Sequence, residues 1–378
     1  MNYKSIFNLL GILLGIFSLS FVPPLMLTFT YEESGREIFL YSFIFFFILG
    51  GSIWAATRQQ NLPLNISDGF IITTLFWVVL AFAGSIPFYF FGLSVSDAIF
   101  ESVSGITTTG ATTIVGLDSL PKSILLYRQL LQWIGGMGLI VLAVAVMPAL
   151  GIGGGQLYKM ELPGSHGNQK LTPKITDSAK ALWKIYVGLT FTCAMLYLLS
   201  GMTLFDSIAH SLSTVAGGGF STHDESIGFF NSAIIETVCI IFMLLSAASF
   251  AVHYVAIFGG KPLKYFYDSE FRFFLSVVLL IILISLMVHI LSNSYADVFS
   301  AISSSIFHTV SIVTTSGFTT ENFSLWPGFL PYLLLVGAFM GACSQSVGGG
   351  IKAWRVLIMV NQAYKLSLIH ISEPTRPY

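Results

Sequence analysis

Long apolar segments alternate with short polar ones along most of this chain. A helix needs about 20 apolar residues to cross the hydrocarbon core of a bilayer. The segments that meet this condition are 6–30, 37–57, 69–92, 123–149, 182–204, 229–258, 272–292 and 329–360. The pattern therefore predicts an all-α polytopic membrane protein, in which most helices run from one face of the membrane to the other.

The composition supports the same class. Hydrophobic residues make up 54% of the chain and charged residues 9%, with 34 Phe and a mean hydropathy of +0.81. Such a chain cannot cover a water-exposed globular surface with polar groups. Its net charge of −1 gives no sign of a nucleic-acid partner. Cys193, Cys239 and Cys343 all lie in apolar stretches, which argues against a disulfide framework or a cysteine zinc site.

A ten-residue pattern recurs three times, in the gaps after the third, fifth and seventh apolar segments. It occupies residues 101–110, 210–219 and 308–317, and each copy ends in glycine. Each copy begins with a polar residue, has a serine three positions later and follows an upstream aspartate: Glu101, Ser104 and Asp97; His210, Ser213 and Asp206; His308, Ser311 and Asp297. Each is too short and polar to span, so we expect a half-helix N-capped by the aspartate and an extended return.

The repeats divide the chain into helix–re-entrant loop–helix pore units around a central ion pathway. An extra N-terminal helix pair covers residues 1–65, and the pore units cover 66–155, 176–262 and 268–361. Residues 156–175 form a cytoplasmic connector, within a stretch rich in Gly, Lys and Pro that either docks a soluble partner or only connects.

The end of each repeat has the residues that a carbonyl-lined pathway requires. A dehydrated monovalent cation needs several neutral oxygens, and a chain that turns successive carbonyls to one side visits dihedrals that favour glycine. We call these three stretches the candidate filter segments: Thr108, Thr109 and Gly110; Gly217, Gly218 and Gly219; Thr315, Ser316 and Gly317. No carboxylate lies beside these glycines, which argues against a divalent ion. The alternative is that glycine and serine only let membrane helices pack closely.

The last apolar segment contains a second glycine-rich stretch, which should break its helix. Its members are Gly341, Ser344, Gln345, Ser346, Gly348, Gly349 and Gly350. A loop below an external filter is a natural gate, and a kink with no regulatory role is the alternative. Lys352 either contacts this loop or extends to the membrane surface.

Charged residues predict the orientation. Most Lys and Arg residues fall on one side of the predicted topology, which should be cytoplasmic together with the N-terminus, and only Arg36, Lys122 and Arg128 fall on the other. Six acidic residues are predicted to lie on the external side: Glu32, Glu33, Asp118, Asp224, Glu225 and Glu321. These acids either raise the local cation concentration or form an ordinary solvated surface.

The motifs TTTGATT, STVAGGGFSTHDESIGFF, SIVTTSGFTT and GACSQSVGGGIK, with QLYKMELPG at 156–164, resemble the TrkH type of the Trk/Ktr/HKT superfamily of potassium transporters. The resemblance implies a multi-pass, K⁺-translocating subunit of the bacterial inner membrane with four pore units. It also implies a homodimer that binds a cytosolic nucleotide-binding Trk regulatory subunit. K⁺ is then the transported ion, with no tightly bound organic cofactor.

The resemblance also implies roles for residues. The filter glycines of the family map onto Gly110, Gly219 and Gly317, and K⁺ would bind at Thr109, Gly110, Gly218, Gly219, Ser316 and Gly317. The gate loop of the family maps onto residues 341–350, where Val347 replaces a usual threonine.

The end of the chain departs from the family. No fourth pore unit follows, and residues 366–376, LSLIHISEPTR, read like a translated sequencing adaptor. We therefore expect a truncated gene product with a non-native tail at 366–378, and a chain that, as written, does not conduct as a monomer.

Other functions stay open from the residues alone. A secondary transporter of another solute would also show repeats and broken helices. An intramembrane hydrolase could use Ser104 with His210 or His253. The absence of a fourth unit also allows a non-conducting assembly subunit.

Overall fold

The structure, a computed structural model, describes residues 3–58, 66–146 and 175–372, which form helices and loops without strands. Residues 156–174 of the expected connector and 373–378 of the expected tail lie outside them. The α-helices are α1 (Tyr3–Ser18), α2 (Val22–Thr30), α3 (Arg36–Thr57), α4 (Ile66–Phe90), α5 (Val95–Ile106), α6 (Lys122–Val146), α8 (Ile175–Leu199), α9 (Leu204–Ala216), α10 (Ala233–Ala247), α11 (Phe250–Ile257), α12 (Lys264–Tyr267), α13 (Ser269–Leu291), α14 (Val298–Val313), α15 (Leu330–Met340) and α16 (Ala353–Ser372).

Several of these helices confirm the predicted membrane spans. Among the described residues, five are long and apolar enough to cross a bilayer: Tyr3–Thr30, Arg36–Thr57, Asp68–Phe90, Lys180–Leu199 and Ser269–Leu291. The first combines α1, a short 3₁₀ turn and α2. The protein is therefore an all-α integral membrane protein.

Two predicted spans are broken helices. The break predicted in the last apolar segment is confirmed, because α15 ends at Met340 and α16 begins at Ala353. The continuous span predicted at 229–258 is wrong, since α10 and α11 meet at an angle of 104°. Extended backbone at Ala248 ends α10, and the Ser249 side chain caps α11 by accepting a hydrogen bond from Ala251 N.

Each repeat forms a half-helix, as predicted, but two of the three predicted caps are wrong. Asp297 does cap α14. Helix α5 is capped instead by Ser94, whose hydroxyl accepts a hydrogen bond from Asp97 N and donates one to the Asp97 carboxylate. Thr203 caps α9 in the same way through Asp206. These aspartates therefore lie in the first turn, as the acidic members of capping boxes.

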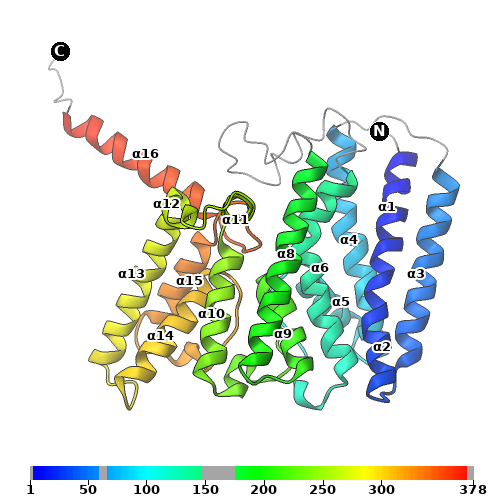
Figure 1. The fold of residues 1–378 in the computed structure, drawn as a ribbon, viewed down its shortest axis with the longest axis horizontal. Helices are drawn as coiled ribbons and strands as arrows, with labels where there is room; N and C mark the ends of the chain where they lie inside the picture. Colours follow the sequence, from blue (N-terminus) through cyan, green and yellow to red (C-terminus); the bar gives the residue numbers. More distant parts are fainter. Residues whose placement is uncertain (1–2, 59–65, 147–174, 373–378) are drawn as a thin grey trace.

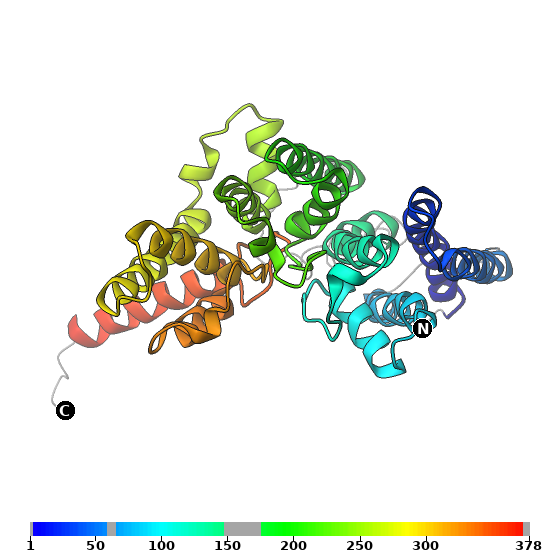
Figure 2. The ribbon, with the colours of Figure 1, turned by 90° about the horizontal axis from the view of Figure 1, so that it is seen from below.

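The helices form three units in a row (Figure 1): α4–α5–α6, then α8–α9–α10–α11, then α13–α14–α15. Seen along the perpendicular direction they follow an arc, and α1 to α3 lie beyond the first unit (Figure 2). Helix α6 packs on α8 and α9, and α10 packs on α14. Among the N-terminal helices, α1 packs on α4 and α2 packs on α6. Figure 1 shows α16 extending away from the bundle. The extended segments that follow α5, α9 and α14 meet inside the arc.

Candidate functional site

The three candidate filter segments share one backbone conformation. The first and third residues of each are left-handed: Thr108 and Gly110 with φ of 55° and 78°, Gly217 and Gly219 with 66° and 77°, Thr315 and Gly317 with 63° and 86°. The middle residue of each is not left-handed. Alternation of this kind turns successive carbonyls to the same side of the chain, which is the geometry of a carbonyl-lined path.

The turn that leads into each segment is also repeated. The middle residue of each segment donates its backbone N–H to the carbonyl of the serine five positions earlier, from Thr109 to Ser104, Gly218 to Ser213 and Ser316 to Ser311, over 2.9–3.0 Å. The half-helices thus end in the same way, and each directs its C-terminal carbonyls toward the segment that follows. The partial negative charge at these ends favours a cation.

Adjacent candidate filter segments touch through their backbones. A Cβ atom added to Gly110 would lie 2.1 Å from Gly218 O, and one added to Gly219 would lie 2.0 Å from Ser316 O. Only glycine fits at these two contacts. A Cβ on Gly317 would meet no atom within 4 Å. The first segment therefore packs on the second and the second on the third, with open space beside the last glycine.

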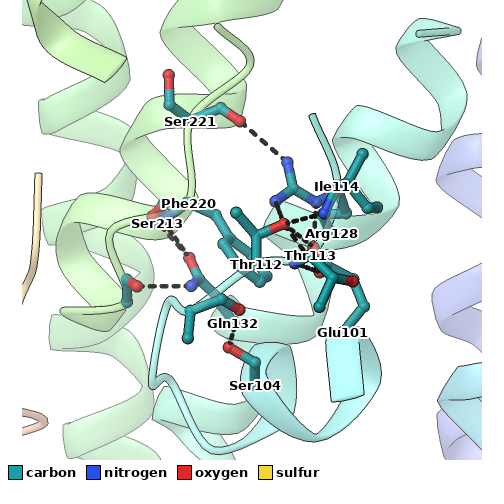
Figure 3. A network of polar contacts seen from close by, with 12 residues as sticks. Glu101, Ser104, Thr112, Thr113, Ile114, Arg128, Gln132, Ser213, Phe220 and Ser221 are labelled. Atoms are coloured by element: carbon teal, nitrogen blue, oxygen red, sulfur yellow. Dashed lines mark hydrogen bonds and ion pairs between the residues drawn. The ribbon is translucent and has the colours of Figure 1, made fainter. Parts of the chain in front are cut away.

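A buried ion pair supports the first two segments (Figure 3). Arg128 Nε of α6 lies 2.6 Å from Glu101 Oε1 of α5, and both side chains have no solvent exposure. Thr112 Oγ1 donates to Glu101 Oε2 at 2.9 Å and accepts from Arg128 Nη2 at 3.0 Å. Arg128 Nη1 donates to Ser221 O at 3.2 Å, in the loop that follows the second segment. One guanidinium thus joins two pore units.

Gln132, one turn further along α6, binds the second segment directly. Its Nε2 donates to Gly218 O at 2.7 Å, while its Oε1 accepts from Ser213 Oγ at 2.7 Å and from Phe220 N at 3.2 Å. In the other two units the equivalent serine binds the carbonyl of the residue after the filter glycine, Ser104 to Ala111 O and Ser311 to Phe318 O. Gln132 replaces this contact in the second unit.

The polar residue that begins each repeat binds the loop that follows the candidate filter segment. Glu101 accepts from Thr112, and the His210 ring lies 2.9 Å from Ser221 Oγ. The His308 ring lies 3.3 Å from Glu321 O. One position of the repeat therefore has one structural task in all three units.

The loop between α15 and α16, which we call the 341–352 loop, contacts the candidate filter segments. Gly349 N donates to Thr315 Oγ1 at 2.6 Å. Val347 lies beside the second segment, since a Cβ atom added to Gly217 would be 3.6 Å from Val347 Cγ2. Lys352 contacts the loop, because its ammonium group donates to Gly348 O. The loop therefore lies against the second and third segments.

Comparison with known proteins identifies the family. The family model for TrkH, described as a cation transport protein, matches residues 35–375. The chain belongs to the TrkH family. It is 47% identical to the Trk system potassium uptake protein TrkH of Vibrio parahaemolyticus, over 96% of this chain and 76% of that protein. The corresponding values are 44%, 96% and 76% for TrkH of Escherichia coli K12, and 40%, 99% and 77% for its TrkG.

A solved structure agrees with the family assignment. The crystal structure of the potassium transporter TrkH from Vibrio parahaemolyticus matches with a TM-score of 0.87 and 44% identity. The match covers 100% of this chain and 79% of that chain. The sequence resemblance and the fold prediction are thereby confirmed.

The hydrolase alternative finds no support in this TrkH-family fold. Ser104 Oγ donates to Ala111 O. The ring nitrogens of His210 lie beside Asp206 O and Ser221, and those of His253 beside Tyr265 and Leu245 O. Neither histidine contacts Ser104 as a general base would. Among the described residues, no group of three or more His, Cys, Asp or Glu side chains could hold a metal ion.

The acids expected on the external side differ in their contacts. Asp224, Glu225 and Glu321 line one pocket of about 530 Å³ beside the strands that leave the second and third candidate filter segments. Glu33 instead accepts hydrogen bonds from Lys122 N and Ser123 N at the start of α6. Arg128, predicted to be an external cation, is buried in the ion pair. The sequence pattern missed Arg128 and Gln132 as supports of the filter.

A contact between the loops of the first two units in this TrkH-family chain predicts a pH dependence. His223 contacts Asp118, which joins the loops of two units, and lies 3.5 Å from Asp206 of its own unit. Burial disfavours charged His223, but hydrogen bonds to Asp206 and Asp118 outweigh it and raise the pKa of His223. The hydrogen bond with His223 lowers the pKa of Asp118. The stabilisation from His223 is complete below its ordinary pKa of about 6.5 and is lost as the pH rises through the raised value.

We therefore expect the apparent melting temperature in detergent to fall as the pH rises above the ordinary histidine pKa of about 6.5, and His223→Gln to flatten this fall. The charge on Asp118 contributes above its ordinary pKa and is lost only as the pH falls through the lowered value. Thermal unfolding of both proteins across this range measures the effect. Equal pH dependence in the wild type and the variant would contradict it.

Proposed function

We propose that this chain serves in potassium uptake across the bacterial inner membrane, as the ion-translocating subunit. The observation that carries the proposal is the shared alternating conformation of the three candidate filter segments, which touch one another in order. Curated relatives at 44–47% identity are named as potassium uptake proteins. The repeated half-helices add a favourable field for a cation without a fixed charge at the pathway.

In this proposal K⁺ leaves its water shell for the carbonyls around Thr109, Gly110, Gly218, Gly219, Ser316 and Gly317. Glu101, Arg128 and Gln132 hold the carbonyl positions, because Glu101 and Arg128 bind residues that follow the segments and Gln132 binds Gly218 O itself. The 341–352 loop acts as the gate, which is supported by its contacts with Thr315 and beside Gly217. Lys352 fixes the loop through its contact with Gly348 O.

The surroundings of the subunit are proposed from the family and from the charge pattern. The concentration of Lys and Arg on one side of the predicted topology supports a cytoplasmic N-terminus. Membership of the TrkH family supports a homodimer that binds a cytosolic nucleotide-binding Trk regulatory subunit. The external pocket lined by Asp224, Glu225 and Glu321 would attract cations to the outer mouth.

Rubidium flux into liposomes that contain the full gene product tests the function. We expect saturable rubidium uptake that potassium inhibits, because both ions have similar demands on carbonyl oxygens. Each candidate filter segment has only three residues, so we expect few ion sites and measurable competition by sodium. Absence of cation flux under every nucleotide condition would refute the potassium function, and uptake of another solute would favour a secondary transporter.

A further inference from the structure

A buried carboxylate ties the two ends of the 341–352 loop together. Glu270, in the first turn of α13, is 7% exposed. Its Oε1 accepts hydrogen bonds from Ser344 N at 2.5 Å and from Trp354 N at 3.0 Å. Ser344 lies near the start of the loop and Trp354 in the first turn of α16. A single oxygen thus contacts both sides of the helix break, which the backbone hydrogen bond from Ala353 N to Ala342 O also joins.

This carboxylate is not needed by its own helix. Asp268 caps α13 by accepting a hydrogen bond from Phe271 N at 2.9 Å. Glu270 instead binds donors 74 and 84 positions away in the sequence. A buried carboxylate is costly unless hydrogen bonds compensate it. Its two partners therefore determine where the loop lies relative to α13.

The rest of the loop has one fixed half and one that faces the candidate filter segments. Cys343 N donates to Ala247 O and Phe250 N donates to Gln345 O, both at 3.0 Å, which pairs this half with the break between α10 and α11. The other half contacts two candidate filter segments. Gly349 N donates to Thr315 Oγ1, and the Val347 side chain lies beside Gly217. A path past the loop opens only if Val347 and Gly349 move while the two ends of the 341–352 loop stay in place.

We propose that Glu270 is the positioning residue that keeps the 341–352 loop closed beneath the candidate filter segments. Without its carboxylate the two ends of the helix break separate more readily, and the loop leaves the filter more often. The effect on ion flux rests on the proposed function, whereas the effect on loop position does not. The experiment therefore measures the two separately.

Cys343 reports the position of the loop end that Glu270 binds, because it precedes Ser344 and is a free thiol that is only 1% exposed. We would treat the protein in membranes with a small maleimide and measure modification of Cys343 by mass spectrometry, which distinguishes it from Cys193 and Cys239. Loss of hydrogen bonds to a charged group should make Glu270→Ala label about tenfold faster than the wild type. Glu270→Gln keeps an acceptor oxygen and should label at an intermediate rate.

Glu33→Ala is the matched control. The Glu33 carboxylate also accepts two backbone hydrogen bonds, from Lys122 N at 2.7 Å and Ser123 N at 3.0 Å, but it lies far from the loop in the chain. We expect this variant to leave Cys343 labelling unchanged. Equal acceleration in Glu33→Ala, or wild-type labelling in folded Glu270→Ala or Glu270→Gln, would overturn the proposal.

Rubidium flux on the same preparations separates this inference from the proposed function. If Glu270→Ala accelerates both labelling and flux, Glu270 positions a gate. If labelling rises while flux stays at the wild-type level, Glu270 positions the loop and the gating role of the loop is refuted. If flux rises with unchanged labelling, the positioning role of Glu270 is refuted. Glu270→Gln supplies the same readouts if Glu270→Ala fails to fold.

Discussion

Replacement of Gly219 by alanine is expected to reduce rubidium flux by about a hundredfold. The added Cβ would lie 2.0 Å from Ser316 O, at a residue whose φ is +77°. Left-handed strain and displacement of the neighbouring carbonyl together cost on the order of 3 kcal/mol, which corresponds to about a hundredfold in an equilibrium. The carbonyl that must move is one that we assign to ion coordination, so the loss should appear in flux before it appears in folding.

Two other glycines provide graded controls for this prediction. Gly317 has a φ of +86° but open space where a Cβ would lie, so Gly317→Ala carries the strain without the clash and should lose less flux. Gly51 lies in α3 with nothing within 4 Å of an added Cβ, and Gly51→Ala should behave as the wild type. Flux in proteoliposomes, normalised to folded protein, measures all three. Wild-type flux in Gly219→Ala would contradict the assignment of this segment as a filter.

The repeated features of the site could be predicted from the sequence. Serine and glycine recur at the same spacing in all three copies, and the same spacing produces the same turn, from Thr109 to Ser104 and from Ser316 to Ser311. Glycine at the third position agrees with the left-handed backbone found there. Such local chemistry depends on neighbouring residues, which is why the half-helices were predicted correctly.

The capping residues were also visible but were misassigned. Ser94 precedes Asp97 by three positions, as Thr203 precedes Asp206, which is the spacing of a capping box. Only Asp297 acts as the cap itself. A hydroxyl three residues before an acid was therefore the better signal for the start of α5 and α9.

The breaks show where sequence patterns lose information. The break after α15 has three consecutive glycines, whereas the one after α10 falls in Ser246-Ala-Ala-Ser249, without glycine or proline. Tertiary contacts stabilise the second break, because Ala247 O and Phe250 N pair with the 341–352 loop. A contact that joins residues so far apart along the chain leaves no local trace.

The role of Arg128 was missed for the same reason, because its contact is with a residue far away along the chain. Arg128 lies near one end of an apolar segment, so the topology counted it among external cations, but it binds Ser221 O, 93 positions away. One signal could have found it: the repeat begins with Glu101 in the first copy and with histidine in the others. An acid buried at that position requires a cation.

Removal of Arg128 is expected to cost about 3–5 kcal/mol of stability, because it leaves Glu101 buried without its partner. Arg128→Met should therefore lower the apparent melting temperature in detergent and reduce the yield of monodisperse protein. Arg128→Lys should rescue little, since one ammonium cannot reproduce the three contacts of the guanidinium with Glu101, Thr112 and Ser221 O.

The double variant Glu101→Gln with Arg128→Met separates the cost of an unpaired charge from the value of the pair. Neutralising both partners should recover much of the stability lost in Arg128→Met, because no uncompensated charge remains buried.

Arg36→Met is the control, since Arg36 is exposed and packs over the Phe29 ring, and it should change the melting temperature little. A wild-type melting temperature in Arg128→Met would show that the pair does not support the fold. Recovery of stability without recovery of rubidium selectivity over sodium would show that the pair also fixes the carbonyls of the candidate filter segments, because Arg128 joins the first unit to Ser221, which follows the second segment.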